Sequence, residues 1–211
     1  ILGSLREALL ARGMPARTID ESGQPTPVTV TGVQRRCFLE TRPSLVAGSP
    51  AGLYGGAFAL AAPEQVRAAT QALSPPTVSN ILAMAAPMGG CGAYTRDEMF
   101  GTLRTAYTGF AAARQESGRV APGIARTVVH TGFWGCGVFG GDRTLMTILQ
   151  SLAADLAGVD IVFWTVGAEG ARLGNTARER YERLRDVTRA VPELMDALLE
   201  QGFAWGVSDG N

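Results

Sequence analysis

Short apolar runs rich in β-branched residues alternate with longer stretches of helical periodicity through most of the chain after residue 77. This pattern predicts three strands, at Val78–Ala85, Ile124–Thr131 and Asp160–Val166. It predicts three helices, at Arg96–Arg114, Asp142–Ala157 and Asn175–Arg189, the last of them interrupted by Pro192. Strands and helices in this order are typical of a mixed, mostly parallel sheet flanked by helices. The sequence therefore predicts an α/β fold.

The helix expected at Asp142–Ala157 carries the clearest buried stripe. Asp142 suits the N-cap position, because its carboxylate can accept a hydrogen bond from an unpaired N–H group of the first turn. Apolar residues then recur at helical spacing and predict one buried face, made of Leu145, Ile148, Leu149, Leu152 and Leu156.

The N-terminal third is less regular. A helix at Leu5–Arg12, a loop at Gly13–Pro27, a strand at Val28–Val33 and a helix at Pro63–Leu73 are expected, whereas Pro43–Ala62 fits no single element. The length of 211 residues suits one domain with a substantial core, so residues 1–211 are predicted to form a single domain.

Composition excludes several classes of function. The chain has 19 basic and 19 acidic residues, and no lysine, so a nucleic-acid interface, a Schiff base and a Walker-type phosphate loop are not expected. Three cysteines without CxxC spacing and a single histidine make a metal site improbable. No signal peptide and no apolar run long enough to span a bilayer is found. We therefore expect a cytoplasmic protein with a small-molecule partner, no membrane or nucleic-acid partner, and no cofactor.

A glycine-rich loop separates the second predicted strand from the helix at Asp142. Gly135, Gly137 and Gly140 form a literal GxGxxG, which lets backbone N–H groups approach a diphosphate. A Rossmann site would need an acidic residue about 20 positions later, where Glu169 is loosely available. A tight turn that only packs closely is the other interpretation, and GxGxxG alone does not separate the two.

The longer string is more specific. Residues 131–142 read TGFWGCGVFGGD, which closely resembles the TGNWGCGAFGGD loop of poly(ADP-ribose) glycohydrolases. The resemblance continues through DIVFWTVG at residues 160–167 and LRTAYTGF at residues 103–110, and it covers about residues 78–170. It implies a macrodomain, in which ADP-ribose lies in a crevice at the strand ends.

The resemblance also implies roles for individual residues. The backbone of Gly135–Phe139 would hold the diphosphate, with the side chain of Phe139 near the ribose, and Tyr54 would cap the ligand. Two positions depart from the family: Phe133 replaces an asparagine, and Val166 replaces the phenylalanine that packs on adenine. The predicted ligand-binding residues are Tyr54, Phe133, Gly135, Cys136, Gly137, Val138, Phe139 and Val166.

The acidic pair of the family's Gln-Glu-Glu motif is missing. Residues 34–46, QRRCFLETRPSLV, resemble that motif and the helix after it, and they place Arg35 and Arg36 at the two acidic positions. A rival alignment uses Gly55 and Gly56 and puts Gln65 at the position of the acid. Arginine cannot act as a general acid, but it can clamp a carboxylate or a phosphate.

Three functions follow from this comparison. The chain binds ADP-ribose or a related phosphate-bearing molecule without hydrolysing poly(ADP-ribose), or it is an enzyme repurposed to another anionic substrate, for example in a bacterial biosynthetic pathway. A third, less favoured function is hydrolysis with a substitute carboxylate such as Glu40 or Glu64. The sequence leaves enzymatic activity undecided.

Overall fold

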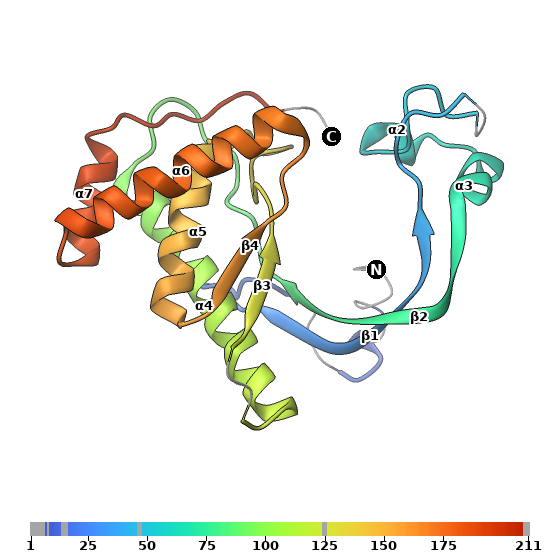
Figure 1. Cartoon of the computed structure of the whole chain (residues 1–211), viewed down its shortest axis with the longest axis horizontal. Helices are drawn as coiled ribbons and strands as arrows, with labels where there is room; N and C mark the ends of the chain where they lie inside the picture. Colours follow the sequence, from blue (N-terminus) through green and yellow to red (C-terminus); the bar gives the residue numbers. More distant parts are fainter. Residues whose placement is uncertain (1–6, 8, 14–16, 46–47, 124–125, 209–211) are drawn as a thin grey trace. The chain divides into compact units, whose positions relative to one another are not determined.

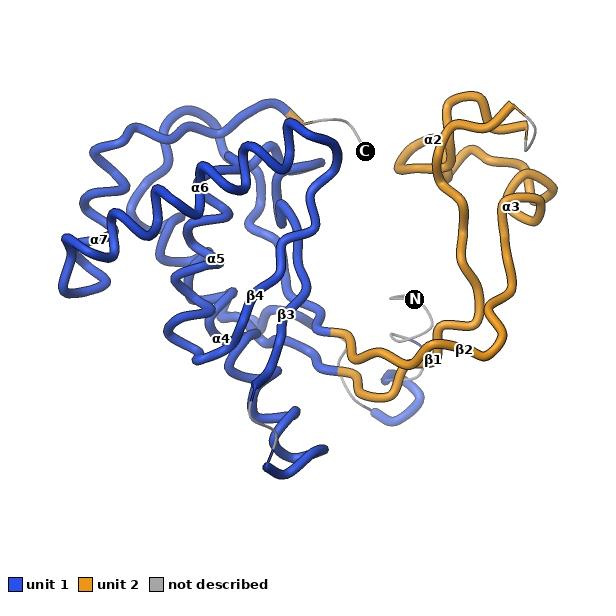
Figure 2. Tube along the Cα trace, viewed as in Figure 1, with its two compact units in different colours: residues 1–29, 82–207 blue, residues 30–81, 208–211 orange. Residues whose placement is uncertain are grey.

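The computed structural model describes residues 7, 9–13, 17–45, 48–123 and 126–208. Its contacts divide the chain into two compact units, coloured separately in Figure 2. Unit 1 contains Ile1–Thr29 and Leu82–Val207, and unit 2 contains Val30–Ile81 with the last four residues. The single domain expected over residues 1–211 stays a prediction.

Unit 1 alternates helices with two short strands (Figure 1). In chain order its elements are α4 (Arg96–Val120), β3 (Val128–Thr131), α5 (Arg143–Ala157), β4 (Asp160–Phe163), α6 (Gly167–Val187) and α7 (Val191–Leu199). The strands β3 and β4 are parallel, and Val128 pairs with Asp160 and Thr131 with Phe163. The crossover between them is α5, as expected for a parallel pair.

The α/β class is confirmed, but the prediction of one mostly parallel sheet is wrong. Among the described residues there are two sheets of two strands each, β1 with β2 and β3 with β4. The segment expected as a buried strand at Val78–Ala85 instead belongs largely to β2 (Thr70–Ala83), where Val78 is exposed. An apolar run bounded by turn signals does not reveal its partner strand, because pairing is a tertiary property.

The helix α5 forms the centre of the core of unit 1. Leu145, Ile148, Leu149 and Leu152 are buried, as the stripe predicted, and α4 and α6 pack against the helix. Leu156 is 47% exposed, which corrects the prediction for that residue. It lies in the last turn of α5, just before the left-handed Gly158 ends the helix and the chain leaves the core.

Several predicted boundaries shift by a few residues. Ile124 lies outside the described residues, and β3 begins at Val128. The strand β4 ends at Phe163, and α6 begins already at Gly167 rather than Asn175. Beyond α6, Pro192 lies in the first turn of the separate helix α7, where a proline needs no amide hydrogen.

Unit 2 is built around the ribbon of β1 and β2. The strand β1 covers Val28–Leu39, so it continues past the predicted end at Val33. Figure 1 shows β1 and β2 running in opposite directions. Two short helices lie between them in the chain, α2 (Gly56–Ala59) and α3 (Pro63–Ala69). The helix expected at Pro63–Leu73 therefore ends early, because Thr70 already has extended backbone.

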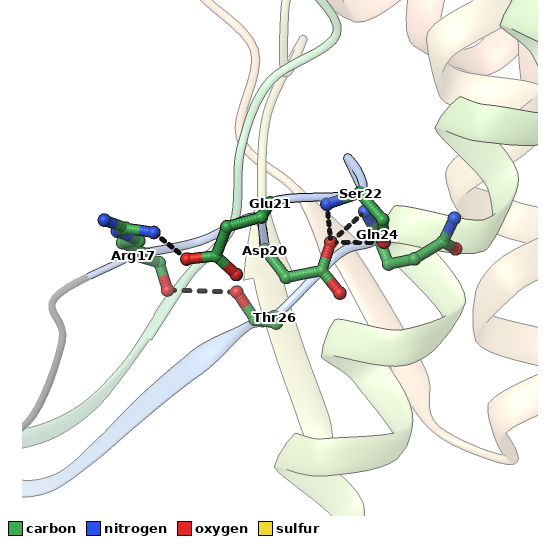
Figure 3. A network of polar contacts seen from close by, with 6 residues as sticks. All are labelled: Arg17, Asp20, Glu21, Ser22, Gln24 and Thr26. Atoms are coloured by element: carbon green, nitrogen blue, oxygen red, sulfur yellow. Dashed lines mark hydrogen bonds and ion pairs between the residues drawn. The ribbon is translucent and has the colours of Figure 1, made fainter.

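The loop predicted at Gly13–Pro27 is confirmed for the residues described there. Figure 3 shows its polar network, in which the Asp20 carboxylate accepts hydrogen bonds from the backbone N–H groups of Ser22 and Gln24 at 2.9 and 2.8 Å. The Ser22 hydroxyl also donates to it and is the main cause that lowers the pKa of Asp20. Of the helix expected at Leu5–Arg12, residues 5, 6 and 8 lie outside the described residues, and Glu7, Leu9 and Leu10 are helical.

Candidate functional site

The carboxyl ends of β3 and β4 lie at the same edge of their sheet, because the strands are parallel. The glycine-rich loop, residues 132–141, follows β3, and residues 164–166 follow β4 and lead into α6. The N–H group of Trp164 donates to the carbonyl of Thr131 at 2.8 Å, which holds the two chain segments together where the strands end. Open α/β sheets usually bind ligands at such an edge.

The helix α5 fixes the start of the glycine-rich loop through a buried amide. The side chain of Gln150 accepts a hydrogen bond from the Thr131 hydroxyl at 2.8 Å and donates to the carbonyl of Gly132 at 3.1 Å. Burying a polar side chain is tolerated where its hydrogen bonds are made. The end of β3 is therefore tied to the middle of α5.

The loop folds back on itself in a shape that only glycine allows at two positions. The N–H group of Gly141 donates to the carbonyl of Gly135 at 2.9 Å. Gly135 has a φ of 78°, a region that residues with a side chain rarely adopt. At Gly141 a Cβ atom would lie 2.7 Å from the Gly135 oxygen. Both glycines therefore serve the turn, whatever the loop binds.

Three consecutive N–H groups of the loop stay open. Those of Gly137, Val138 and Phe139 meet no hydrogen-bond acceptor among the residues that the structure describes. The residues Val138 and Phe139 are 48% and 39% exposed, so a ligand can reach this part of the loop. Successive free N–H groups in a turn favour an anion. The arrangement can therefore hold a phosphate or a carboxylate.

The start of α5 is less open than the loop. The Asp142 carboxylate accepts a hydrogen bond from the N–H group of Leu145 at 2.8 Å and caps the helix, as predicted. Its negative charge also offsets the positive end of the helix dipole. The free amides of the loop, rather than the helix terminus, are the groups that could accommodate an anion.

Trp205 and Gly206, which follow α7, help to hold the end of the glycine-rich loop in place. The N–H group of Gly206 donates to the Gly140 carbonyl at 2.7 Å. The ring of Trp205 stacks on Tyr94 with 4.2 Å between centroids, and the Tyr94 hydroxyl accepts from the N–H group of Asp142 at 3.0 Å. These contacts hold Gly140 and Asp142 in position. They do not involve the open N–H groups of the loop.

The side chain of Cys136, a residue of the loop, is buried, although the resemblance placed Cys136 among the ligand-binding residues. Burial is the main cause that raises the pKa of its thiol to about 12; the charge of Asp142 adds to the rise, and that of Arg143 opposes it. The thiol is therefore protonated at neutral pH, and a nucleophilic role is not favoured.

The two departures from the family lie at the same edge but differ in exposure. Phe133 is partly buried and packs beside α6, where a Cβ atom at Gly170 would lie 3.6 Å from its ring. Val166 is 94% exposed directly before α6. The ring of Phe133 therefore packs against α6, whereas Val166 exposes a small aliphatic side chain to solvent.

Two further side chains at this edge were not predicted from the sequence. The Arg143 guanidinium lies over the Phe133 ring, 5.4 Å from its centroid. Trp164 is 68% exposed, and its indole N–H donates to Nδ1 of His130 at 3.0 Å. The available signal was the position of Arg143 just after the N-cap Asp142 and of Trp164 directly after β4.

Arg35 and Arg36 lie in β1 and belong to unit 2, whereas the glycine-rich loop belongs to unit 1 (Figure 2). Both are exposed; Arg35 lies over the Phe38 ring, and Arg36 donates to the Gln34 side chain at 2.9 Å. Neighbouring residues of a strand point to opposite faces, so a ligand on one face would meet only one of the two. Their role, like that of the exposed Tyr54, stays a prediction.

Glu40 and Gln65 each have local hydrogen-bond partners. The Glu40 carboxylate binds Arg42, and these hydrogen bonds lower the pKa of Glu40 to about 2. It is therefore ionised at neutral pH and unsuited to donate a proton. Gln65, at the position of the acid in the rival alignment, accepts from the N–H group of Ala62 and donates to the carbonyl of Gly48, so it caps α3.

Within the described part of the chain, no group of three or more metal-ligating side chains comes together. None of the described helices combines the length and the apolar character needed to cross a membrane.

The family model of poly(ADP-ribose) glycohydrolase with the macro domain fold matches residues 54–172. The match contains Tyr54, the glycine-rich loop and Val166, and Arg35 and Arg36 lie outside it. It covers more than half of the 211 residues and points to a function in binding or hydrolysing ADP-ribose compounds. The chain belongs to the poly(ADP-ribose) glycohydrolase family of macro domain proteins.

Proposed function

We propose that this protein binds ADP-ribose, or a related small molecule that carries phosphate, at the glycine-rich loop and does not hydrolyse poly(ADP-ribose) in the manner of the family's enzymes. The observation that carries the proposal is the set of open N–H groups at Gly137, Val138 and Phe139. A diphosphate offers the oxygen acceptors that these groups lack. Membership of the poly(ADP-ribose) glycohydrolase family suggests that ADP-ribose is the molecule that carries the diphosphate.

Binding is tested by titrating the protein with ADP-ribose in a calorimeter. A Gly137→Asp variant puts a carboxylate among the open amides, so like-charge repulsion should weaken binding by about tenfold or more. Gly137 does not have a positive φ, so a side chain is compatible with its backbone, and the variant is expected to fold. Gly137→Ala is the matched control, because it adds a side chain without a charge.

ADP-ribose is not the ligand if the parent protein does not bind it, and the proposal fails as a whole if the parent binds neither ADP-ribose nor pyrophosphate. It also fails if folded Gly137→Asp binds as tightly as Gly137→Ala. Circular dichroism and the thermal midpoint of both variants establish that a loss of affinity is not a loss of structure.

The absence of standard hydrolysis rests on the missing acid. Cleavage of a glycosidic bond needs a protonated carboxyl group near the leaving oxygen, and loss of a general acid typically costs roughly 10²–10⁴-fold in rate. Both alignments of the motif put a residue without a carboxyl group at that position, and Glu40 is held ionised by Arg42. Incubation with poly(ADP-ribose) should release no ADP-ribose; release at the rate of an active family enzyme would contradict the proposal.

A second candidate is an enzyme acting on a different anionic substrate. The exposed Val166 favours it, because an aliphatic side chain offers a poor surface for an adenine ring. Pyrophosphate or a sugar phosphate binding more tightly than ADP-ribose would favour this candidate over the first.

A further inference from the structure

Arg143 is held in place at the end of the glycine-rich loop. It is the first residue of α5, and its guanidinium lies 5.4 Å from the centroid of the Phe133 ring. The ring is itself held, because it packs beside Gly170 of α6. A guanidinium over an aromatic face keeps its charge and its N–H donors while its position becomes restricted. The side chain of Arg143 therefore has a defined position beside the glycine-rich loop.

The charge of Arg143 is not neutralised by a neighbouring carboxylate. No ion pair joins it to an acidic side chain within the described ranges, whereas Arg126 pairs with Asp160 and Arg185 with Asp155. Its guanidinium therefore has N–H donors available for a ligand.

The charge also acts on the loop itself. Burial raises the pKa of the Cys136 thiol and the charge of Asp142 adds to the rise, while the positive charge of Arg143 opposes it. The acidic residue next to it in the sequence is Asp142, whose carboxylate accepts a hydrogen bond from the N–H group of Leu145. Asp142 is thus engaged in the helix cap, and the arginine stays open.

We propose that Arg143 binds the ligand directly, donating to an anionic oxygen of a molecule whose phosphate is held by the amides of Gly137–Phe139. This deepens the proposed function and rests on it. The ligand class is a diphosphate or a molecule with two neighbouring anionic groups, because the amides belong to the glycine-rich loop and the guanidinium belongs to the first residue of α5, two positions after that loop ends.

The test compares two probes, ADP-ribose and inorganic pyrophosphate, in calorimetric titrations of the parent protein and of Arg143→Gln. We expect the variant to bind each probe about tenfold more weakly, as for a lost hydrogen bond to a charged group. The dependence of affinity on salt concentration should also become weaker, because one charge contact has gone.

Arg104→Gln is the matched control. Arg104 is an exposed arginine of α4 that also forms no ion pair with another described residue, so its removal changes the net charge equally. It should leave both affinities unchanged. An equal effect of the two substitutions would show a general charge effect and overturn the proposal.

The remaining outcomes separate this proposal from the one on function. If Gly137→Asp abolishes ADP-ribose binding and Arg143→Gln binds both probes as the parent does, the proposed function holds and the role of Arg143 is wrong. If the parent binds pyrophosphate but not ADP-ribose, and Arg143→Gln weakens that binding, the anion site is supported and ADP-ribose is not its ligand. A parent protein that binds neither probe contradicts both.

Discussion

Cys136 shows how a residue inside the ligand loop can serve the fold instead of the chemistry. Its side chain is buried, and its Sγ lies 3.7 Å from the Trp134 carbonyl. Because burial favours the neutral thiol, the pKa is raised to about 12 and little thiolate exists near neutral pH. The reactive form of a cysteine is the thiolate. Cys136 is therefore protected from thiol reagents both because its side chain is buried and because its thiol stays protonated.

This protection predicts the outcome of thiol labelling. Cys37 and Cys91 are exposed, and none of the three cysteines forms a disulfide. In the native protein at pH 8, a thiol reagent should modify Cys37 and Cys91 rapidly, while Cys136 should react only after unfolding in urea. Mass spectrometry of the labelled peptides identifies the sites. Rapid native labelling of Cys136 would show that the loop opens readily.

At the residue scale, the sequence was informative where a motif was long. The string from Thr131 to Asp142 predicted the loop, its turn glycines and the N-cap, and all three are present. The contact of Arg143 with Phe133 could not be predicted, because it depends on how the first turn of α5 leaves the loop. The same holds for Trp164 and His130, which come from two different strands and their ends.

At the element scale, α5 was the most predictable part of the chain. Its periodic apolar residues and its N-cap specify both its face and its start, whereas α6 has no side-chain cap and began earlier than expected. Helix boundaries without a capping residue carry a weak signal in sequence. The loop shares Asp142 with α5, so the cap of this helix also sets where the loop ends.

The N-cap gives a prediction for stability. Asp142→Ala removes the acceptor of the 2.8 Å hydrogen bond from the N–H group of Leu145, and it should lower the free energy of unfolding by about 1 kcal/mol. Asp142→Asn is the control, because asparagine caps helices nearly as well and should cost much less. Urea unfolding followed by circular dichroism measures both. Equal losses in the two variants would mean that the charge, and not the cap, matters.

At the scale of the whole molecule, the sequence predicted the α/β class but not the sheets. The strands predicted at Val28–Val33 and Val78–Ala85 cover parts of β1 and β2, but nothing in their sequence indicates that β1 and β2 pair with each other and leave β3 and β4 as a separate pair. Strand pairing depends on long-range contacts, which a single sequence does not contain. The division into two units likewise follows from contacts and not from a linker rich in glycine or proline.

The two units differ in how much apolar side chain they bury, and this predicts their local stability. The buried cluster of unit 1 surrounds α5, whereas the buried hydrophobic residues described in unit 2 are Leu53 and Ala69. Most positions of β2 are exposed, as are Leu45 and Leu60. Segments with few buried contacts open at low free-energy cost, so their amide hydrogens exchange quickly.

Hydrogen exchange followed by mass spectrometry should therefore separate the units. Peptides from β1 and β2 are expected to exchange much faster than peptides from α5, whose amides should be the slowest in the chain. Saturating ADP-ribose should slow exchange in the peptide covering residues 131–142, because the ligand would accept hydrogen bonds from the open N–H groups of Gly137–Phe139. The peptide from α7 serves as an internal control and should not change. Exchange of β1 and β2 as slow as that of α5 would contradict the expected difference, and would mean that the apolar side chains of the ribbon are covered in solution.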